Sequence, residues 1–508
     1  MIRPTSVQRS VVPVMVLLVS ALAGFTAVSS ESFWIDEANS ALKALQPSLA
    51  SWWHVLVAQR GSDLQMPLYM LQLWAWEKIC GSGEFALRSV NIVWLCLGQG
   101  ALLWAFDRRP RFAVITGGLG ALSPLLWFYL NDARPYLMQY AGACLLCAVL
   151  FRATEDPMGA LRSRTIWVFG AGLFVLCGSS LLGVIWAAGA LVAWIFLVGP
   201  ARKNLAMRQL VGPVAATLTC LTFLGGFYLW TIWLGAGASK VGDTRFLNLA
   251  FISYEFSGVA GLGPGRLQIR QDGFEAFQAL SSLRLFAVVA ASFLSLGVFL
   301  IGMWAAAKRL RARAQIAGLL YTLLPGLLLL VFGCLLHFRL LGRHFIPLLP
   351  PVLGLMTLGI VALASRRRSF GIAAGIALSC VWLVSDLSLR FGERHRKDDY
   401  RTAAEVAKAA LAASEVVWWS ADSSAAIYYE VPIHSPSGSG GVFLMIHPTA
   451  DDLARLSEPN TVIASKPDLY DGQIDNLADY LAAHAFTPTR ELPAFTIWRR
   501  RRAAPAGR

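Results

Sequence analysis

The sequence predicts a polytopic α-helical membrane protein with about eleven transmembrane helices, followed by a small C-terminal extracytoplasmic α/β domain. The 508 residues are 56% hydrophobic and only 15% charged, with a mean hydropathy of +0.56, which is too apolar for a water-soluble domain of this length. Short basic segments separate the apolar runs. After residue 388 the composition changes, because the tail carries 14 basic and 15 acidic residues.

The apolar runs give the helix count. A transmembrane helix needs about 20 mostly apolar residues. The run 165–199 is long enough for two helices with a turn at Gly178, Ser179 and Ser180, and the predicted spans then number about eleven. The runs are residues 11–29, 89–106, 112–130, 135–151, 165–199, 211–234, 284–307, 315–336, 344–364 and 370–388.

Basic residues predict the orientation. The formal net charge is +14, but the excess lies in short loops between spans, and positive loops mark the cytoplasmic side. With a cytoplasmic N-terminus, every strongly basic short loop falls on that side. We therefore interpret the charge as a topology signal and expect no nucleic acid partner. The basic groups are Arg108/Arg109/Arg111, Arg152/Arg162/Arg164, Arg202/Lys203/Arg208, Lys308/Arg309/Arg311/Arg313 and Arg366/Arg367/Arg368.

The segment 67–81 is ambiguous. Counting it as a span would move every later basic loop outside, so we expect it to lie along or dip into the outer leaflet, with its aromatic residues at the interface. The predicted organisation is then a membrane domain over residues 1–388 and a soluble domain over 389–508. The membrane domain has two large external loops, residues 30–88 and 235–283.

Two further patterns favour structural interpretations. Seven of the eight cysteines fall in apolar runs, which excludes a disulfide scaffold. In the tail, Trp418 and Trp419 followed by Asp422 resemble an oligosaccharyltransferase acceptor motif, but the pattern favours a strand that ends at a helix cap. The tail also contains helix-like residues 405–413 and strand-like residues 461–464 and 495–498.

The chemistry is predicted at the outer ends of the helices. The spans are nearly free of ionisable groups, unlike those of most ion-coupled transporters, which keep acids, His or Lys near the bilayer midplane. Polar residues collect instead where spans meet the outer surface, and we expect them to share one pocket there. They are Asp36, Glu37, Asp63, Arg88, Asp132, Arg134, His337, Arg339, Arg343 and His344.

Five segments in order resemble a known family. They are FWIDEANSALKAL, PLYMLQLW, GEFALRSV, SPLLWFYLNDARPYLMQY and GRHFIPLLPP. Together they resemble the integral-membrane GT-C glycosyltransferases, in particular the branch with the bacterial relatives of the protein O-mannosyltransferases and the lipid A aminoarabinose transferase. The resemblance covers roughly residues 10–140 and 339–351.

The resemblance implies transfer of a sugar from a polyprenyl-phosphate-linked donor to an acceptor hydroxyl, outside the cytoplasm and with inversion. The acceptor is a glycan, a lipid or a protein, and the location is the inner (cytoplasmic) membrane. The family's acidic pair maps onto Asp36 and Glu37, with Asp36 as the catalytic base. This assignment agrees with chemistry, because attack by an alcohol needs a carboxylate within hydrogen-bond reach of its proton.

The leaving phosphate needs cations, and arginine presents a two-pronged donor for its oxygens. The resemblance implies Arg134 for the phosphate, with Arg88, Arg343 and His344 as further candidates. Asp132 is expected to steer the acceptor or to bind Mg²⁺ or Mn²⁺, as second-loop acids do in some relatives.

One departure from the family pattern leaves alternatives open. Many relatives carry a His or Lys before two prolines at the start of the membrane-parallel helix, whereas this chain has Gln65, Met66 and Pro67. The sequence therefore leaves open which residue supplies the cation that holds the phosphate. A polytopic translocator of lipids or sugar-lipids without chemistry is the alternative function, and a non-catalytic assembly partner is a third. The acidic pair also fits a solvated helix cap, and the arginines fit snorkelling to headgroups.

Overall fold

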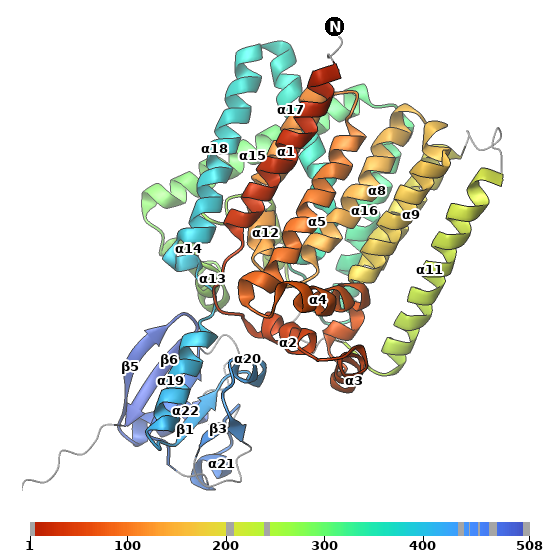
Figure 1. The fold of residues 1–508 in the computed structure, drawn as a ribbon. Coiled ribbons are helices and arrows are strands. Elements are labelled where there is room, and N and C mark those ends of the chain that lie inside the picture. The colour runs from red at the N-terminus through yellow and green to blue at the C-terminus, as the bar shows by residue number, and fades with distance from the viewer. Residues whose placement is uncertain are drawn as a thin grey trace, which may run out of the picture. The chain divides into compact units, whose positions relative to one another are not determined.

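The computed structural model describes residues 6–199, 208–237, 244–434, 441–446, 448–455, 458–466 and 475–500. The chain forms two compact units. Unit 1 comprises residues 1–29, 43–263 and 282–390, and unit 2 comprises residues 30–42, 264–281 and 391–508. Figure 1 shows the helices of unit 1 and the sheet of unit 2.

Long apolar helices dominate unit 1. Seven described helices are long and apolar enough to cross a membrane, and the described spans number eight if the pair α6 (Pro110–Ala121) and α7 (Pro124–Leu130), bent by 50° at its break, forms one span. Three shorter apolar helices coincide with further predicted runs: Val11–Ala27 within α1 (Ser6–Ala27), α9 (Ser163–Ser179) and α10 (Gly183–Val198). The chain is thus a multi-pass membrane protein, while the count of about eleven spans stays a prediction.

The helices of unit 1 follow the chain in order. They are α1 (Ser6–Ala27), α3 (Leu49–Gln59), the 3-10 helix η1 (Ser62–Gln65), α4 (Pro67–Cys80), α5 (Glu84–Ala105), α6 (Pro110–Ala121), α7 (Pro124–Leu130), α8 (Tyr136–Glu155), η2 (Gly159–Leu161), α9 (Ser163–Ser179), α10 (Gly183–Val198), α11 (Arg208–Trp233), α12 (Phe246–Phe256), α15 (Ser282–Arg309), α16 (Ala312–Leu335), η4 (Gly342–Leu348), α17 (Leu349–Arg366) and α18 (Arg368–Phe391).

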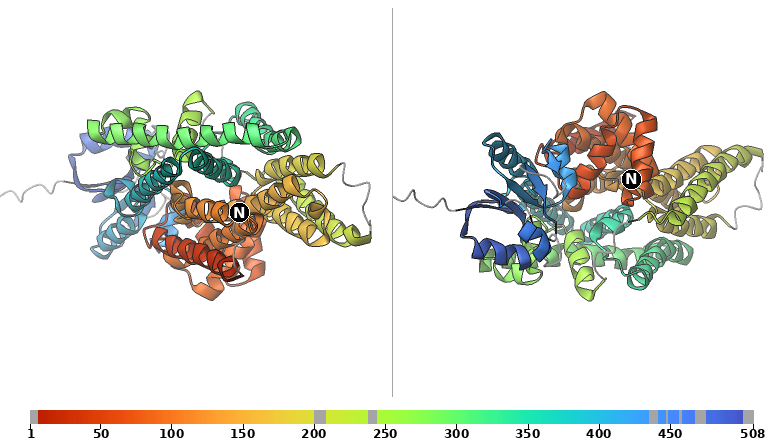
Figure 2. Two further views of the ribbon diagram at one scale, coloured as in Figure 1. Left: turned by 90° about the horizontal axis from the view of Figure 1, so that it is seen from above. Right: turned by 90° about the horizontal axis from the view of Figure 1, so that it is seen from below.

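Proline and glycine shape this helical layer. Pro124 begins α7, where its ring cannot continue α6, so the helix bends at this point. A Cβ at Gly142 of α8 would lie 3.0 Å from the Leu176 nitrogen of α9, so α8 and α9 pack closely only because the residue is glycine. Figure 2 views the long helices from both ends and shows α9, α10 and α11 together on one flank.

The ambiguous segment 67–81 is helix α4. It has 14 residues, begins with Pro67 and ends before Gly81, whose φ of 92° suits glycine. Figure 1 shows α4 lying across the ends of the long helices instead of alongside them. It contacts α5 and α9, and Trp76 donates to the Ala86 carbonyl at 3.0 Å. The helix therefore lies across one end of the bundle, as expected for an interfacial segment.

Unit 2 contains a six-stranded mixed sheet in the order β2-β3-β1-β4-β6-β5. Strands β2, β3, β1 and β4 pair in parallel, and β6 pairs antiparallel with both β4 and β5. The strands are β1 (Val417–Ser420), β2 (Ile433–His434), β3 (Val442–Leu444), β4 (Thr461–Ser465), β5 (Phe486–Leu492) and β6 (Phe495–Arg500). The helices are α13 (Arg266–Asp272), α14 (Glu275–Gln278), the 3-10 helix η5 (Glu393–His395), α19 (Tyr400–Ala412), α20 (Ser423–Tyr428), α21 (Ala450–Arg455) and α22 (Asp475–Ala483).

Two neighbouring tryptophans pack on opposite faces of this sheet, because successive side chains of a strand alternate. Trp418 packs against Tyr480 of α22, with the ring centroids 4.9 Å apart and the ring planes tilted by 37°. The ring centroid of Trp419 lies 6.4 Å from that of Tyr400 of α19 and 6.1 Å from that of Phe495 of β6. Both tryptophans are fully buried, so helices cover both faces and the tail has an α/β core.

Two segments distant in sequence cluster with the tail. Residues 30–42, which carry the acidic pair, and residues 264–281 of the second large loop both belong to unit 2. The predicted division at residue 388 leaves both segments in the membrane domain. Hydropathy marks where a chain leaves the bilayer but does not show which loops pack together afterwards.

Candidate functional site

A buried chain of charges lies in unit 1 (Lys43, Asp63 and Arg134). Lys43 Nζ lies 2.6 Å from Asp63 Oδ2, and Arg134 Nη1 lies 2.6 Å from Asp63 Oδ1. The side chains of Lys43 and Asp63 are at most 1% exposed, and that of Arg134 is 7% exposed. The Asp63 carboxylate therefore forms ion pairs with two cations in the protein interior, where charge-charge interactions are stronger than in water.

Asp63 is held ionised by its two partners. Burial alone raises the pKa of this carboxyl, but the charges and hydrogen bonds of Arg134 and Lys43 outweigh burial and lower the pKa below its ordinary value. The carboxylate is thus negative at neutral pH. It fixes the directions of a lysine and an arginine that the sequence places 91 positions apart.

Arg88 and the turn before α8 form a second buried polar group in unit 1. Arg88 is fully buried and donates to the Ser29 carbonyl at 3.0 Å. Ser29 in turn donates through its backbone N–H and its hydroxyl to Asn131 Oδ1, both at 2.9 Å. Asn91 donates to the Asp132 carbonyl at 2.6 Å. These bonds join the end of α1, the start of α5 and the Asp132–Arg134 turn.

Arg343 and His344 lie in η4 of unit 1. The Arg343 guanidinium lies 6.0 Å from the centroid of the ring of Tyr136, the first residue of α8 after the Asp132–Arg134 turn. His344 Nδ1 accepts a hydrogen bond from the Leu341 N–H at 3.1 Å, and the His344 carbonyl accepts one from Trp186 at 3.0 Å. Arg343 is partly exposed, whereas one ring nitrogen of His344 is occupied in capping its own turn.

Asp36 and Glu37 begin helix α2 (Ile35–Ala44), and their environments differ. Glu37 is fully buried, and its Oε2 lies 2.8 Å from Lys397 Nζ of unit 2. The same oxygen faces the Trp34 N–H at 3.5 Å, as in a helix cap. Asp36 is partly exposed, so its carboxylate is the more accessible of the two.

The tail holds the segment that carries Asp36. The Phe33 N–H donates to the Tyr429 hydroxyl at 2.8 Å, and Arg401 donates to the Ser30 carbonyl at 2.7 Å. The pKa of Asp422 is raised above its ordinary value. Burial and the negative charge of Asp36 raise it, and they outweigh the hydrogen bonds from Ser424, which lower it. Asp422 also caps α20 through the Ser424 N–H at 2.8 Å, which confirms the predicted helix cap after the tryptophan pair.

Helix α2 links Asp36 to the buried charges through its own backbone. Asp36 and Lys43 are seven positions apart, so they lie on the same face of the helix, about 10 Å apart along its axis. Residues 35–42 cluster with unit 2 and Lys43 with unit 1.

The departure at Gln65 has a structural counterpart. The Gln65 side chain donates to the Ala236 carbonyl at 2.8 Å, and the Gln65 carbonyl accepts from the Leu181 N–H at 3.0 Å. It fixes loops and carries no charge. The 3-10 helix η1, which contains Gln65, nevertheless has a cation beside it. Lys43 forms an ion pair with Asp63, which precedes Gln65 by two residues in η1.

Sequence reasoning did not select Lys43 or Lys397. The available signal for Lys43 is its position seven residues after Asp36 in a helical pattern, which puts it on the face of the acid. Lys397 lies 360 residues beyond Glu37, and no local pattern connects them.

The described residues do not supply a metal site. Among them, no group of three or more His, Cys, Asp or Glu side chains gathers closely enough to hold an ion. Asp132 is almost fully buried, and a Mg²⁺ or Mn²⁺ ion at this residue stays a prediction without a matching donor set.

Comparison with solved structures identifies the fold. The crystal structure of ArnT from Cupriavidus metallidurans in the apo state matches with a TM-score of 0.52 at 14% identity, over 96% of this chain and 97% of ArnT. The chain has the ArnT fold. The structure of the same ArnT bound to undecaprenyl phosphate matches with a TM-score of 0.50 at 15% identity over the same shares of both chains. The resemblance to GT-C enzymes is thereby confirmed at the level of the fold.

At the sequence level, no family model and no curated protein matches the chain. The ArnT fold accounts for both units, since 96% of the chain is covered. The roles of Asp36, Glu37, Arg88, Asp132, Arg134, Arg343 and His344 stay predictions.

Proposed function

We propose that the chain is a membrane glycosyltransferase that moves a sugar from a polyprenyl-phosphate-linked donor to an acceptor hydroxyl on the extracytoplasmic side, with inversion. The ArnT fold carries this proposal, because the ArnT of that fold has been crystallised with undecaprenyl phosphate. The proposed setting is the inner membrane, with a cytoplasmic N-terminus and an extracytoplasmic C-terminal domain.

In the proposed reaction the Asp36 carboxylate accepts the proton of the acceptor hydroxyl. The acceptor oxygen forms a bond to the anomeric carbon as the bond from that carbon to the phosphate oxygen breaks. The polyprenyl phosphate leaves with the electron pair. A single displacement of this kind inverts the anomeric carbon and needs no second, covalent carboxylate.

Cations of unit 1 are proposed to hold the phosphate. Lys43 and Arg134 share one carboxylate, so the three groups together carry one net positive charge at neutral pH. Such fixed charges stabilise the developing charge of a leaving phosphate. Arg343, which is partly exposed beside Tyr136, is the proposed further ligand. In this scheme Lys43 supplies the cation that Gln65 lacks.

Two of the predicted site residues suit positioning roles better. Glu37 is fully buried and paired with Lys397, so we assign it to fixing the start of α2. Arg88 is fully buried against the Ser29 carbonyl and holds the turn that carries Arg134.

The test compares Asp36→Asn with the control Glu405→Gln, which removes an exposed acid from α19. Asp36→Asn is expected to lower transfer by about 10²–10⁴-fold, the range of general base catalysis. Glycolipids and glycans of cells that carry each variant as the sole copy are compared by mass spectrometry. Binding of undecaprenyl phosphate to each purified protein is measured in parallel.

The expected result is lost transfer with retained lipid binding in Asp36→Asn. An unchanged glycan profile in that variant would reject the enzyme and favour the translocator. Lost lipid binding together with lost transfer would reject Asp36 as the base, because removing a base leaves donor binding intact.

A further inference from the structure

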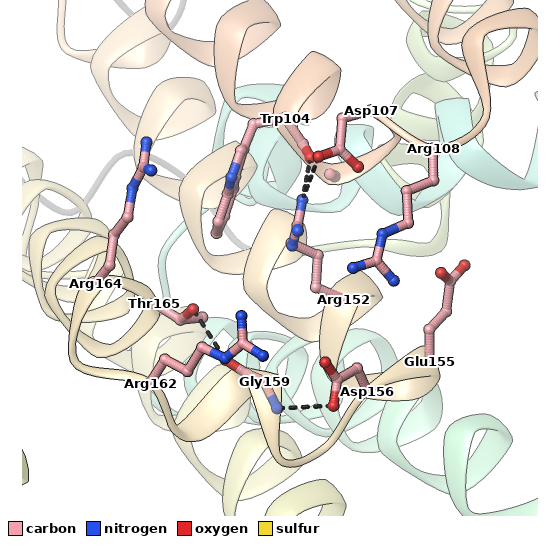
Figure 3. Close-up of a pocket in the computed structure, with 11 residues that line it drawn as sticks. Trp104, Asp107, Arg108, Arg152, Glu155, Asp156, Gly159, Arg162, Arg164 and Thr165 are labelled. Carbon is pink, nitrogen blue, oxygen red and sulfur yellow. Dashed lines mark hydrogen bonds and ion pairs between the residues drawn. The ribbon is translucent and has the colours of Figure 1, made fainter. Parts of the chain in front are cut away.

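A charged cavity lies in unit 1 at the ends of α5 and α8 opposite to Arg88 and Arg134. It has a volume of about 170 Å³ and lies between the end of α5, the end of α8, η2 and the start of α9. Figure 3 shows its lining. Arg88 and Trp104 are 16 residues apart on α5, which corresponds to about 24 Å along the helix. The cavity is therefore most of a bilayer thickness away from the candidate catalytic groups.

The acids of this cavity are already engaged. Asp107 pairs with Arg152 at 3.2 Å, and Glu155 pairs with Arg109 at 2.7 Å. Asp156 accepts a hydrogen bond from the Gly159 N–H at 2.8 Å, which closes the loop before η2. Arginines of the chain thus neutralise Asp107 and Glu155, while Asp156 is held by a backbone hydrogen bond.

Arg152 is fixed in place. It donates to the Trp104 carbonyl at 2.6 Å, and its guanidinium lies 4.6 Å from the centroid of the Trp104 ring. Figure 3 shows it between Trp104 and Asp107. One wall of the cavity is thus a rigid pairing of an arginine with an aromatic ring.

Three arginines of the lining remain available. The side chains of Arg108, Arg162 and Arg164 are exposed and form no ion pair or hydrogen bond with any part of the chain that the structure describes. Arg162 caps α9 without a side-chain hydrogen bond, and the first turn of α9 has no acid. The positive end of this helix therefore adds to the charge of the arginines.

The position of the cavity at the ends of two membrane-spanning helices indicates which class of ligand it binds. Helices α5 and α8 are long and apolar enough to span a membrane, and both end at the cavity. Their ends lie at the boundary between hydrocarbon and water, where Trp104 is also favoured and where phospholipid phosphates are found. Basic pockets between membrane helices on the cytoplasmic side bind anionic headgroups.

We propose that this cavity, defined by Arg108, Arg152, Arg162 and Arg164, binds the phosphate headgroup of an anionic phospholipid. Arginine presents paired N–H donors to phosphate oxygens, and three of the four guanidinium groups have no competing partner in the described chain. This site is separate from the proposed sugar transfer. It gives a specific binding role to basic residues that charge counting treats only as a topology signal.

The test measures binding of phosphatidylglycerol to the full-length protein in neutral detergent by native mass spectrometry. The variant is the triple substitution Arg108→Gln, Arg162→Gln and Arg164→Gln. The matched control is the triple substitution Arg309→Gln, Arg311→Gln and Arg313→Gln, which removes three exposed basic residues from the end of α15, the connection after it and the start of α16. Phosphatidylcholine and inorganic phosphate serve as competing probes, and thermal unfolding without lipid verifies that both variants fold.

The proposal expects at least a tenfold loss of phosphatidylglycerol affinity in the cavity variant and less than a twofold loss in the control. Equal losses in both variants would overturn it in favour of nonspecific surface charge. Equal binding of phosphatidylcholine would remove the selectivity for an anionic headgroup. Displacement of the lipid by millimolar inorganic phosphate would identify the ligand as free phosphate instead of a lipid.

Discussion

The two ends of helices α5 and α8 carry arginines in opposite environments. Near one end, Arg88 and Arg134 are buried, and their described hydrogen bonds go to the Ser29 carbonyl and to the Asp63 carboxylate. Near the other end, Arg108 and Arg162 are exposed and face a cavity. The same residue type thus serves as a fixed part of the interior at one end and as an open anion ligand at the other.

The difference shows what burial does to a charge. An exposed ion pair contributes little to stability, because water screens it and both side chains lose freedom. A buried charge is tolerated only with its partners, so losing one partner is costly. Substitutions at the two ends should therefore differ in their effect on stability.

The largest effect is expected from Asp63→Asn. The substitution leaves Lys43 and Arg134 buried without their shared carboxylate, which costs about 3–5 kcal/mol. Chemical unfolding in detergent micelles measures the change. Asp107→Asn at the other end is the control, because Asp107 is 50% exposed and its loss should cost about 0–1 kcal/mol. Similar costs for both variants would contradict the comparison.

Arg88→Met should have the next largest effect. It removes the donor to the buried Ser29 carbonyl, and an unsatisfied buried group costs about 1–3 kcal/mol. The same measurement on Arg108→Met should give a change within about 0.5 kcal/mol, since exposed residues without partners contribute little. The comparison fails if Arg108→Met is the more destabilising of the two.

The contribution of Asp63 should depend on pH in one direction. Its pKa is lowered in the folded protein, so its stabilising effect is complete above the unfolded pKa of about 3.9 and is lost as the pH falls through the folded value. The difference in unfolding free energy between the native chain and Asp63→Asn should be constant from pH 7 down to about 4 and should shrink below that. A difference that grows on acidification would reverse the assigned sign.

Glu155→Gln should have the smallest effect. Its partner Arg109 is 60% exposed and Glu155 is 41% exposed, so breaking the pair should change stability by about 0–0.5 kcal/mol. Raising the salt concentration should remove even this change, because exposed pairs are screened. If Glu155→Gln lowered the unfolding free energy by more than about 1 kcal/mol and the change persisted in high salt, the charges at the cavity end of α5 and α8 would behave like the buried charges at the other end.

Hydropathy and local pattern predicted much of the architecture. The predicted apolar runs coincide with described helices, and the segment 67–81 is a helix across one end. The strand predicted at Trp418 and Trp419 and those at 461–464 and 495–498 fall on β1, β4 and β6. These features depend on solvent transfer and on side-chain alternation, which are local properties of a sequence. The ordered motifs also indicated the fold that ArnT shares.

The candidate site was predictable only in part. Local signals selected Asp36 and Arg134 as candidates, because acids and arginines stand out at helix ends beside apolar spans. Lys43 was not selected, because its burial depends on Asp63, which folds against it from another segment. The pairing of Glu37 with Lys397 depends on a contact across 360 residues. No local pattern encodes such contacts.

The sequence alone determined that the chain crosses a membrane repeatedly and that its polar residues gather at helix ends, and it predicts that the basic loops share one side. Those properties follow from the cost of placing charge in hydrocarbon, which every residue carries with it. The tertiary structure alone decided which charges are buried in pairs, which arginines face a cavity, and that the loop with Asp36 belongs with the tail. Those properties depend on distances between segments, and only packing sets such distances.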